Sequence, residues 1–122
     1  MFPHIFSNEG RQWYADGKLD KKHNSFDDFI AAAEHVVDQG YTTNDQLVAR
    51  GSSAGGLLVA ACANMKPHLF GALCLHSPFL DIYNTLMDKS LPLSVHEYDE
   101  WGDPNDPDIG RYIKVCVNIN IF

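Results

Sequence analysis

The sequence predicts an α/β fold in which a parallel sheet core is flanked by helices, and it predicts that this fold is incomplete. Two patterns indicate the fold class. Helical apolar periodicity alternates with short apolar runs, and a glycine-rich turn joins one such run directly to an apolar helix. The third observation is length, because 122 residues allow one domain at most and a whole sheet of this class needs substantially more chain.

The first well-defined element is a helix predicted over Phe26–Gln39. Before it, Met1–Asn24 is polar and mixed, and we expect a loop that can hold one turn of helix. Apolar residues from position 26 onward recur at helical spacing, with acidic residues on the other face. Ser25 is a candidate N-cap, and Gly40 is expected to end the helix.

The centre of the chain predicts a strand, a turn, a helix and a second strand. Gln46–Arg50 is short and partly apolar, as buried parallel strands are. Gly51–Gly56 is expected to form a sharp turn. Leu57–Met65 is apolar on nearly every side, which is typical of a helix buried against a sheet, and Phe70–Leu75 predicts the second strand. This order is that of a βαβ unit.

The remainder of the chain has weaker patterns. Leu80–Met87 predicts a short helix and Pro92–Tyr98 a loop or turn. The DPNDP run over Asp103–Pro107 predicts a turn.

Composition and charge exclude several classes of protein. The net charge of −7 disfavours nucleic acid and anionic membranes as partners, and no apolar run approaches the roughly 20 residues that span a bilayer. The first ten residues lack a basic stretch followed by an apolar run, so we do not expect a signal peptide there. Cys62, Cys74 and Cys116 lack disulfide-framework or zinc spacing, so we expect reduced, mostly buried thiols in a cytoplasmic protein, without metal or cofactor. The oligomeric state is left open.

One motif carries chemistry: the GSSAG run at positions 51–55 fits G-x-S-x-G, between a predicted strand and a predicted helix. In α/β-hydrolases this turn raises a nucleophilic serine above the sheet, which predicts Ser53 as the nucleophile. The backbone N–H of Ala54 would then be one oxyanion-hole donor.

The glycines of the motif have an expected steric role. Small residues two positions before and after the serine let strand and helix approach closely, and Gly51 and Gly55 meet this requirement. Gly56 would bring the buried helix nearer still. The competing interpretation is a phosphate-binding or purely structural turn. A nucleotide site is disfavoured because the GxGxxG spacing and the GxxxxGK[ST] lysine are absent.

A serine hydrolase also needs a histidine base and an acid that orients it, in the chain order Ser, Asp or Glu, His. After the serine, the sequence offers His68, His76 and His96, each too early for the base, so surface or loop positions are expected for them. Asp81 lies where some hydrolases place the acid, but a capping or turn role is favoured.

Several blocks together resemble the catalytic domain of the prolyl oligopeptidase family of serine peptidases, peptidase family S9. They are GRQWYADGKL, the FDDF helix, GSSAGGLL and the SLPL to EYDEWGDPNDP run. The resemblance extends from about Gly10 to about Lys114 and is strongest to the oligopeptidase B and prolyl endopeptidase-like branches.

The resemblance implies a serine-type oligopeptidase that hydrolyses peptides after Lys or Arg through an acyl-enzyme on Ser53, without a cofactor. It further implies that Glu97 and Asp99 form an acidic pair that recognises the basic side chain, since two carboxylates can converge on one guanidinium. Position 99 carries Asp where the family usually has Glu.

The resemblance also implies that residues 1–122 form only part of a catalytic domain. The propeller domain and the later segment with the catalytic Asp and His would be absent, so the fragment is expected to be inactive by itself. Two alternatives stay open: an esterase or thioesterase of the prolyl endopeptidase-like kind, and a non-catalytic truncated product.

Overall fold

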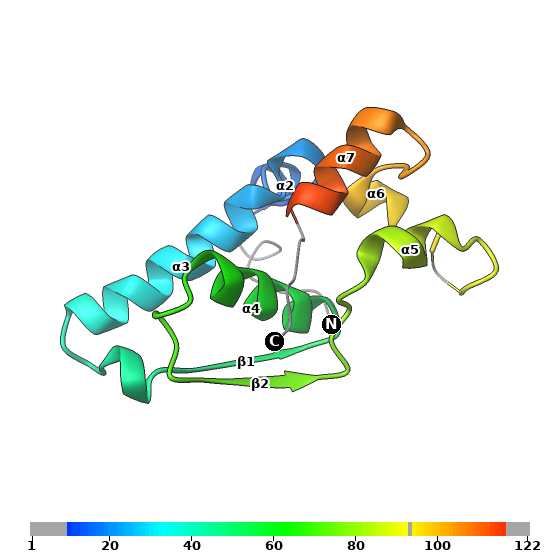
Figure 1. The fold of residues 1–122 in the computed structure, drawn as a ribbon. Coiled ribbons are helices and arrows are strands. Elements are labelled where there is room, and N and C mark those ends of the chain that lie inside the picture. Colours follow the sequence, from blue (N-terminus) through cyan, green and yellow to red (C-terminus); the bar gives the residue numbers. More distant parts are fainter. Residues whose placement is uncertain (1–9, 93, 117–122) are drawn as a thin grey trace.

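The structure, a computed structural model, describes residues 10–92 and 94–116. Two parallel strands, β1 (Val48–Ser52) and β2 (Ala72–His76), lie side by side, and helices cover one face of this small sheet (Figure 1). The register pairs Ser52 with His76 at the carboxyl edge. The predicted combination of a parallel sheet with flanking helices is therefore confirmed.

Helix α4 (Ala54–Met65) connects the two strands and packs against both of them. Seven consecutive residues, 56–62, are buried, because the sheet lies beneath this helix and helix α3 lies above it (Figure 1). A helix enclosed in this way must be apolar all round. α4 begins three residues before the predicted start, so the predicted turn over Gly51–Gly56 narrows to a single residue.

Helix α3 (His23–Asp38) presents Phe26, Ile30 and Ala33 to the core. The N-cap predicted at Ser25 is wrong, because the helix starts two residues earlier. Ser25 is buried in the first turn, where its hydroxyl donates to the carbonyl of Gly17 at 3.1 Å.

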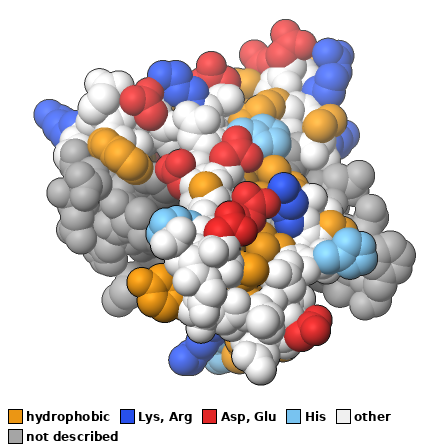
Figure 2. Space-filling view, turned by 90° about the vertical axis from the view of Figure 1, so that its left-hand side faces the viewer, with side chains coloured by type: hydrophobic (Ala, Val, Ile, Leu, Met, Phe, Trp, Pro, Cys, Tyr) orange, Lys and Arg blue, Asp and Glu red, His pale blue; other side chains and the backbone are white. Residues whose placement is uncertain are grey.

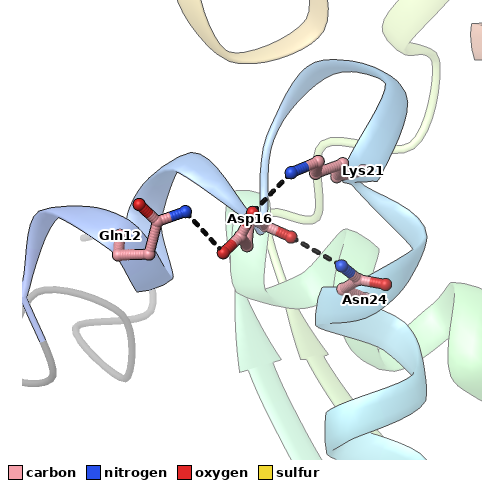
Figure 3. A network of polar contacts seen from close by, with 4 residues as sticks. All are labelled: Gln12, Asp16, Lys21 and Asn24. Atoms are coloured by element: carbon pink, nitrogen blue, oxygen red, sulfur yellow. Dashed lines mark hydrogen bonds and ion pairs between the residues drawn. The ribbon is translucent and has the colours of Figure 1, made fainter.

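The segment before α3 holds one turn of helix, α2 (Arg11–Ala15), and a 3₁₀ turn, η1 (Leu19–Lys21). Asp16 ties these turns together (Figure 3). Its carboxylate accepts from Gln12 Nε2 at 2.8 Å and from Lys21 Nζ at 2.5 Å, and its carbonyl accepts from Asn24 Nδ2 at 2.8 Å. The hydrogen bonds from Lys21 and Gln12 lower the pKa of Asp16.

A second 3₁₀ turn, η2 (Asn44–Gln46), precedes β1, which therefore starts two residues later than predicted. Between α3 and this turn, Gly40 has a φ of +73°, so it ends α3 as expected.

Three helices lie beyond the carboxyl edge of the sheet: α5 (Ile82–Met87), α6 (Tyr98–Trp101) and α7 (Pro107–Cys116) (Figure 1). The predicted short helix is confirmed by α5, whereas α7 was not predicted. Asp106 caps α7 by accepting from the backbone N–H of Asp108 at 2.9 Å. A capping residue followed by proline at the first helical position is a helix start signal. In the DPNDP run, the same two residues are also typical of a turn, so the helix was not predicted.

The prediction that both strands are buried is wrong for the described residues. Val48 is 60% exposed and Leu73 41% exposed, while Ala49 is the one buried residue of the two strands. Parallel strands are buried when both faces of the sheet are covered, and here the described helices cover one.

The surface reflects the acidic composition. Figure 2 shows acidic side chains gathered over the middle of one face, with hydrophobic side chains between them. No helix within residues 10–92 and 94–116 has the length and apolarity needed to cross a bilayer.

The two described cysteines differ sharply in environment, which corrects the expectation of mostly buried thiols. Cys62 is fully buried beneath α3, and burial, with a smaller effect of Asp27, raises the pKa of its thiol to about 12. Cys74 is exposed on β2.

This contrast predicts selective alkylation. In a Cys116→Ser background at pH 8, iodoacetamide is expected to alkylate Cys74 of the native protein at least about 100-fold faster than Cys62. The reason is that only the thiolate reacts and that the core excludes the reagent. Peptide-resolved mass spectrometry measures both rates. Denatured protein, in which the two rates should be similar, is the control, and similar rates in the native protein would contradict the structure.

Candidate active site

Ser53 occupies a sharp bend between the last residue of β1 and the first residue of α4. Its backbone has φ 52° and ψ −123°, a region that L-residues with side chains seldom adopt. The side chain is exposed, while the helix that follows is buried from Gly56 onward. The strand-to-helix bend that the motif predicts is thus present.

Backbone hydrogen bonds fix this strained residue from both sides. The N–H of Ser53 donates to the carbonyl of His76 at 3.1 Å. Its carbonyl accepts from the N–H groups of Gly56 at 3.0 Å, Leu57 at 3.2 Å and Phe79 at 3.0 Å. The first turn of α4 and the loop after β2 therefore hold the bend together.

The glycines around the bend differ in how much space surrounds them. A Cβ at Gly51 would lie 2.1 Å from the carbonyl oxygen of Gly55, and one at Gly56 would lie 2.7 Å from Pro78 Cβ. A Cβ at Gly55 would meet no atom of the described residues within 4 Å. Close approach therefore explains Gly51 and Gly56, whereas the steric reason expected for Gly55 is not found.

Ala54 is the first residue of α4, so its N–H has no acceptor within the helix. This amide follows the exposed serine directly and lies at the positive end of the helix dipole. The arrangement suits stabilisation of a negative charge that develops beside Ser53, as the predicted oxyanion role of Ala54 requires.

No histidine of the described residues hydrogen-bonds the hydroxyl of Ser53. His76 Nδ1 instead lies 3.4 Å from Ser52 Oγ, its register partner across the sheet. His68 and His96 are exposed, and His68 follows the far end of α4.

Asp81 has the capping role that the sequence favoured. It is the N-cap of α5, and its carboxylate accepts from the backbone N–H of Asn84 at 3.3 Å and from Asn84 Nδ2 at 2.9 Å. These bonds engage the carboxylate locally, within its own helical turn.

The predicted acidic pair lies at the start of α6, but its two members are placed differently. Glu97 is the N-cap of α6, with helical backbone angles, and is half-buried, whereas Asp99 is exposed. Residues two apart on a helical turn point in different directions, so the structure does not show the expected convergence. Burial, and then the charge of Glu100, raise the pKa of Glu97, while Lys22 opposes this rise.

Helix α6 contacts η1 and lies beside the first turn of α4, which follows Ser53. A small cavity of about 20 Å³ is lined by Ala54 on one side and by Glu100 and Trp101 on the other. A larger groove of about 300 Å³, lined in part by Glu34 and Met65, lies at the opposite end of α4, so it is separate from the serine site.

The residues that hold α6 in place could not be identified from the sequence pattern. Lys22 Nζ forms an ion pair with Glu100 Oε1 and lies 4.9 Å from the ring centre of Trp101. The two partners of the ion pair are 78 positions apart, and no local pattern joins them.

Comparisons with known proteins agree on one family. The family model described as "Prolyl oligopeptidase family" matches residues 3–118. Protease 2 of Moraxella lacunata is 51% identical over 108 residues, which are 88% of this chain and 16% of that protein. The human "Prolyl endopeptidase-like" protein is 42% identical over 106 residues, 86% of this chain and 15% of the relative.

A solved structure shows the same likeness. Oligopeptidase B from Trypanosoma brucei, with covalently bound antipain, is 46% identical with a TM-score of 0.84, over 88% of this chain and 15% of that one. The chain thus spans about one sixth of the length of these relatives.

Proposed function

This chain belongs to the prolyl oligopeptidase family, and from that premise we propose that it supplies the nucleophile segment of a serine peptidase. The fold is part of the α/β-hydrolase fold that the sequence predicts, since its structural relatives are oligopeptidase B and prolyl endopeptidases. The observation that carries the proposal is Ser53: exposed, strained to positive φ, and followed at once by a helix N-terminus.

The proposed reaction is acyl transfer. Ser53 Oγ attacks the carbonyl carbon of the scissile peptide bond while a histidine base takes its proton. The N–H of Ala54 donates to the resulting oxyanion. Collapse of the intermediate expels the amine, which takes the proton from the histidine, and water then hydrolyses the acyl-enzyme. The exposed, strained position of Ser53 and the place of Ala54 at the N-terminus of α4 support these two proposed roles. Within the described residues, no histidine or acidic side chain is a hydrogen-bond partner of the Ser53 hydroxyl.

For the substrate, we propose peptides cleaved after Lys or Arg, with Glu97 as the main recognition group. Support comes from its half-buried position at the start of α6, a helix whose residues Glu100 and Trp101 line the same small cavity as Ala54. A carboxylate in such a setting forms stronger charge-assisted hydrogen bonds than an exposed one. Asp99, exposed on another side of α6, would contribute less.

A segment exchange tests the proposed activity. Residues 10–115 would replace the matching segment of Moraxella lacunata Protease 2, because the match covers most of this chain but a small part of that protein. We expect the exchanged protein to hydrolyse an arginyl amide and to react with a fluorophosphonate at Ser53. Hydrolysis of short esters without arginyl amide cleavage would favour the esterase or thioesterase alternative. If the exchanged protein is folded but shows no labelling and no hydrolysis, a non-catalytic product is favoured.

Glu97→Gln in the exchanged protein is expected to lower kcat/KM for an arginyl amide by about 30-fold. The reason is that the substrate guanidinium loses the carboxylate that would accept its hydrogen bond. Asp99→Asn is the matched control, with an expected change below about threefold. Steady-state kinetics with arginyl and neutral amides measure both effects. Equal losses in the two variants, or an equal loss with the neutral amide, would contradict the role of Glu97.

A further inference from the structure

We propose that Lys22 and Glu100 are positioning residues: their ion pair holds α6, and with it Glu97, beside the turn of α4 that carries Ala54. Neither side chain needs to touch substrate for this role. The inference rests on the proposed function in one respect only, since it assigns the pair to the site in which Glu97 would bind a basic side chain.

Burial distinguishes this ion pair from the others in the described part of the chain. The side chains of Lys22 and Glu100 are 11% and 14% exposed. Those of Lys21 and Asp16 are 51% and 40% exposed, and two further pairs are at least as open. A pair removed from water strongly resists separation, because removing one partner leaves an uncompensated charge.

Helix α6 needs such an anchor. It contains four residues, too few for a helix that is stable by itself. Lys22 contacts two of them, since its ammonium pairs with Glu100 and lies over the Trp101 ring, which is 3% exposed. A further tie runs from the hydroxyl of Tyr98 to the carbonyl of Leu86, at 2.9 Å. Thus Lys22 fixes the C-terminal end of α6, and the hydrogen bond of Tyr98 fixes its N-terminal end.

The anchor connects the acidic turn to the serine site. Lys22, Glu100 and Trp101 line the same small cavity as Ala54. A shift of α6 therefore changes the distance between Glu97 and the bend at Ser53, which sets where a bound side chain would lie relative to the nucleophile.

The charges of the pair also act on Glu97, with opposite signs. Glu100 raises the pKa of Glu97 and Lys22 lowers it, on top of the larger effect of burial. From α2, Tyr14 faces the same acidic turn, and its own pKa is raised by burial and then by Glu100, Asp99 and Glu97. Lys22 is thus the cation, among the described residues, that favours an ionised Glu97.

The test uses the full 122-residue chain and two measurements that need no substrate. Hydrogen exchange with mass spectrometry follows residues 97–102, and carboxyl ¹³C NMR follows the pKa of Glu97. We expect Lys22→Met to speed exchange in 97–102 at least tenfold and to raise the pKa of Glu97. Lys22→Arg, which keeps the charge, should preserve both. Lys21→Met, which removes the exposed neighbouring pair, is the matched control and should change neither.

Glu100→Gln supplies a second variant with an opposite signature. It should also speed exchange in 97–102, but it should lower the pKa of Glu97, a reversal that a purely structural role would not produce. If Lys22→Met unfolds the whole chain, α4 will lose its protection from hydrogen exchange. The Glu100→Gln variant then decides whether the ion pair positions α6. Unchanged exchange and unchanged pKa in a folded variant would overturn the proposal. Because neither measurement uses Ser53 or a substrate, an inactive exchanged protein would leave this result standing.

Discussion

Ser53→Ala is expected to lower arginyl amide hydrolysis by the segment-exchange protein by a factor of about 10⁴ to 10⁶, because the acyl-enzyme can no longer form. The loss should appear in kcat, with KM little changed, since the bend is held by backbone hydrogen bonds that alanine keeps. Fluorophosphonate labelling should disappear in parallel. Steady-state kinetics and mass spectrometry of the labelled peptide measure both outcomes.

The chain provides its own matched control for this experiment. Ser52 precedes Ser53, is also exposed, and points its hydroxyl to His76. Ser52→Ala removes the same atom one position away, and we expect activity to change by no more than a few-fold. If Ser52→Ala abolished labelling and Ser53→Ala did not, the nucleophile would be Ser52 and the assignment from the motif would be wrong.

The bend at Ser53 could be predicted because its determinants are local. A small residue at 51, a serine at 53 and an apolar helix after it are adjacent in sequence, and the steric requirement that joins them spans six residues. Helix α3 was predictable for the same reason, because its apolar residues recur with the 3.6-residue period of a helix.

The surroundings of the bend could not be predicted, because their determinants are distant. The ion pair of Lys22 with Glu100 joins segments 78 positions apart, and it is visible only once α3 and α6 are packed. The divergence of Glu97 and Asp99 depends on whether their turn is helical, which a run of four residues does not reveal. The prediction that both strands are buried failed for a similar reason, since an apolar strand indicates a covered face without showing what covers it.

The largest stability effect is expected from Gly51→Ala. The added Cβ would lie 2.1 Å from the carbonyl oxygen and 2.6 Å from the carbonyl carbon of Gly55, and 2.8 Å from the amide nitrogen of Gly56. These are backbone atoms of the first turn of α4, so no side chain can rotate away. Relief requires α4 to move off β1, which would also pull apart the bend at Ser53. We expect a loss of at least about 3 kcal/mol in the free energy of unfolding.

Gly55→Ala is the matched control, and the opposite sign is expected. A Cβ there meets none of the described atoms within 4 Å, and the position lies within α4, where alanine is favoured over glycine by roughly 0.5 to 1 kcal/mol. Urea unfolding of the two variants beside the parent chain measures both changes from the midpoint concentrations. Equal midpoints for the two variants would mean that strand and helix are not in contact at Gly51. The hydrolase-type bend would then lose its steric basis, since the contact between Gly51 and Gly55 is what makes the turn sharp enough to expose Ser53.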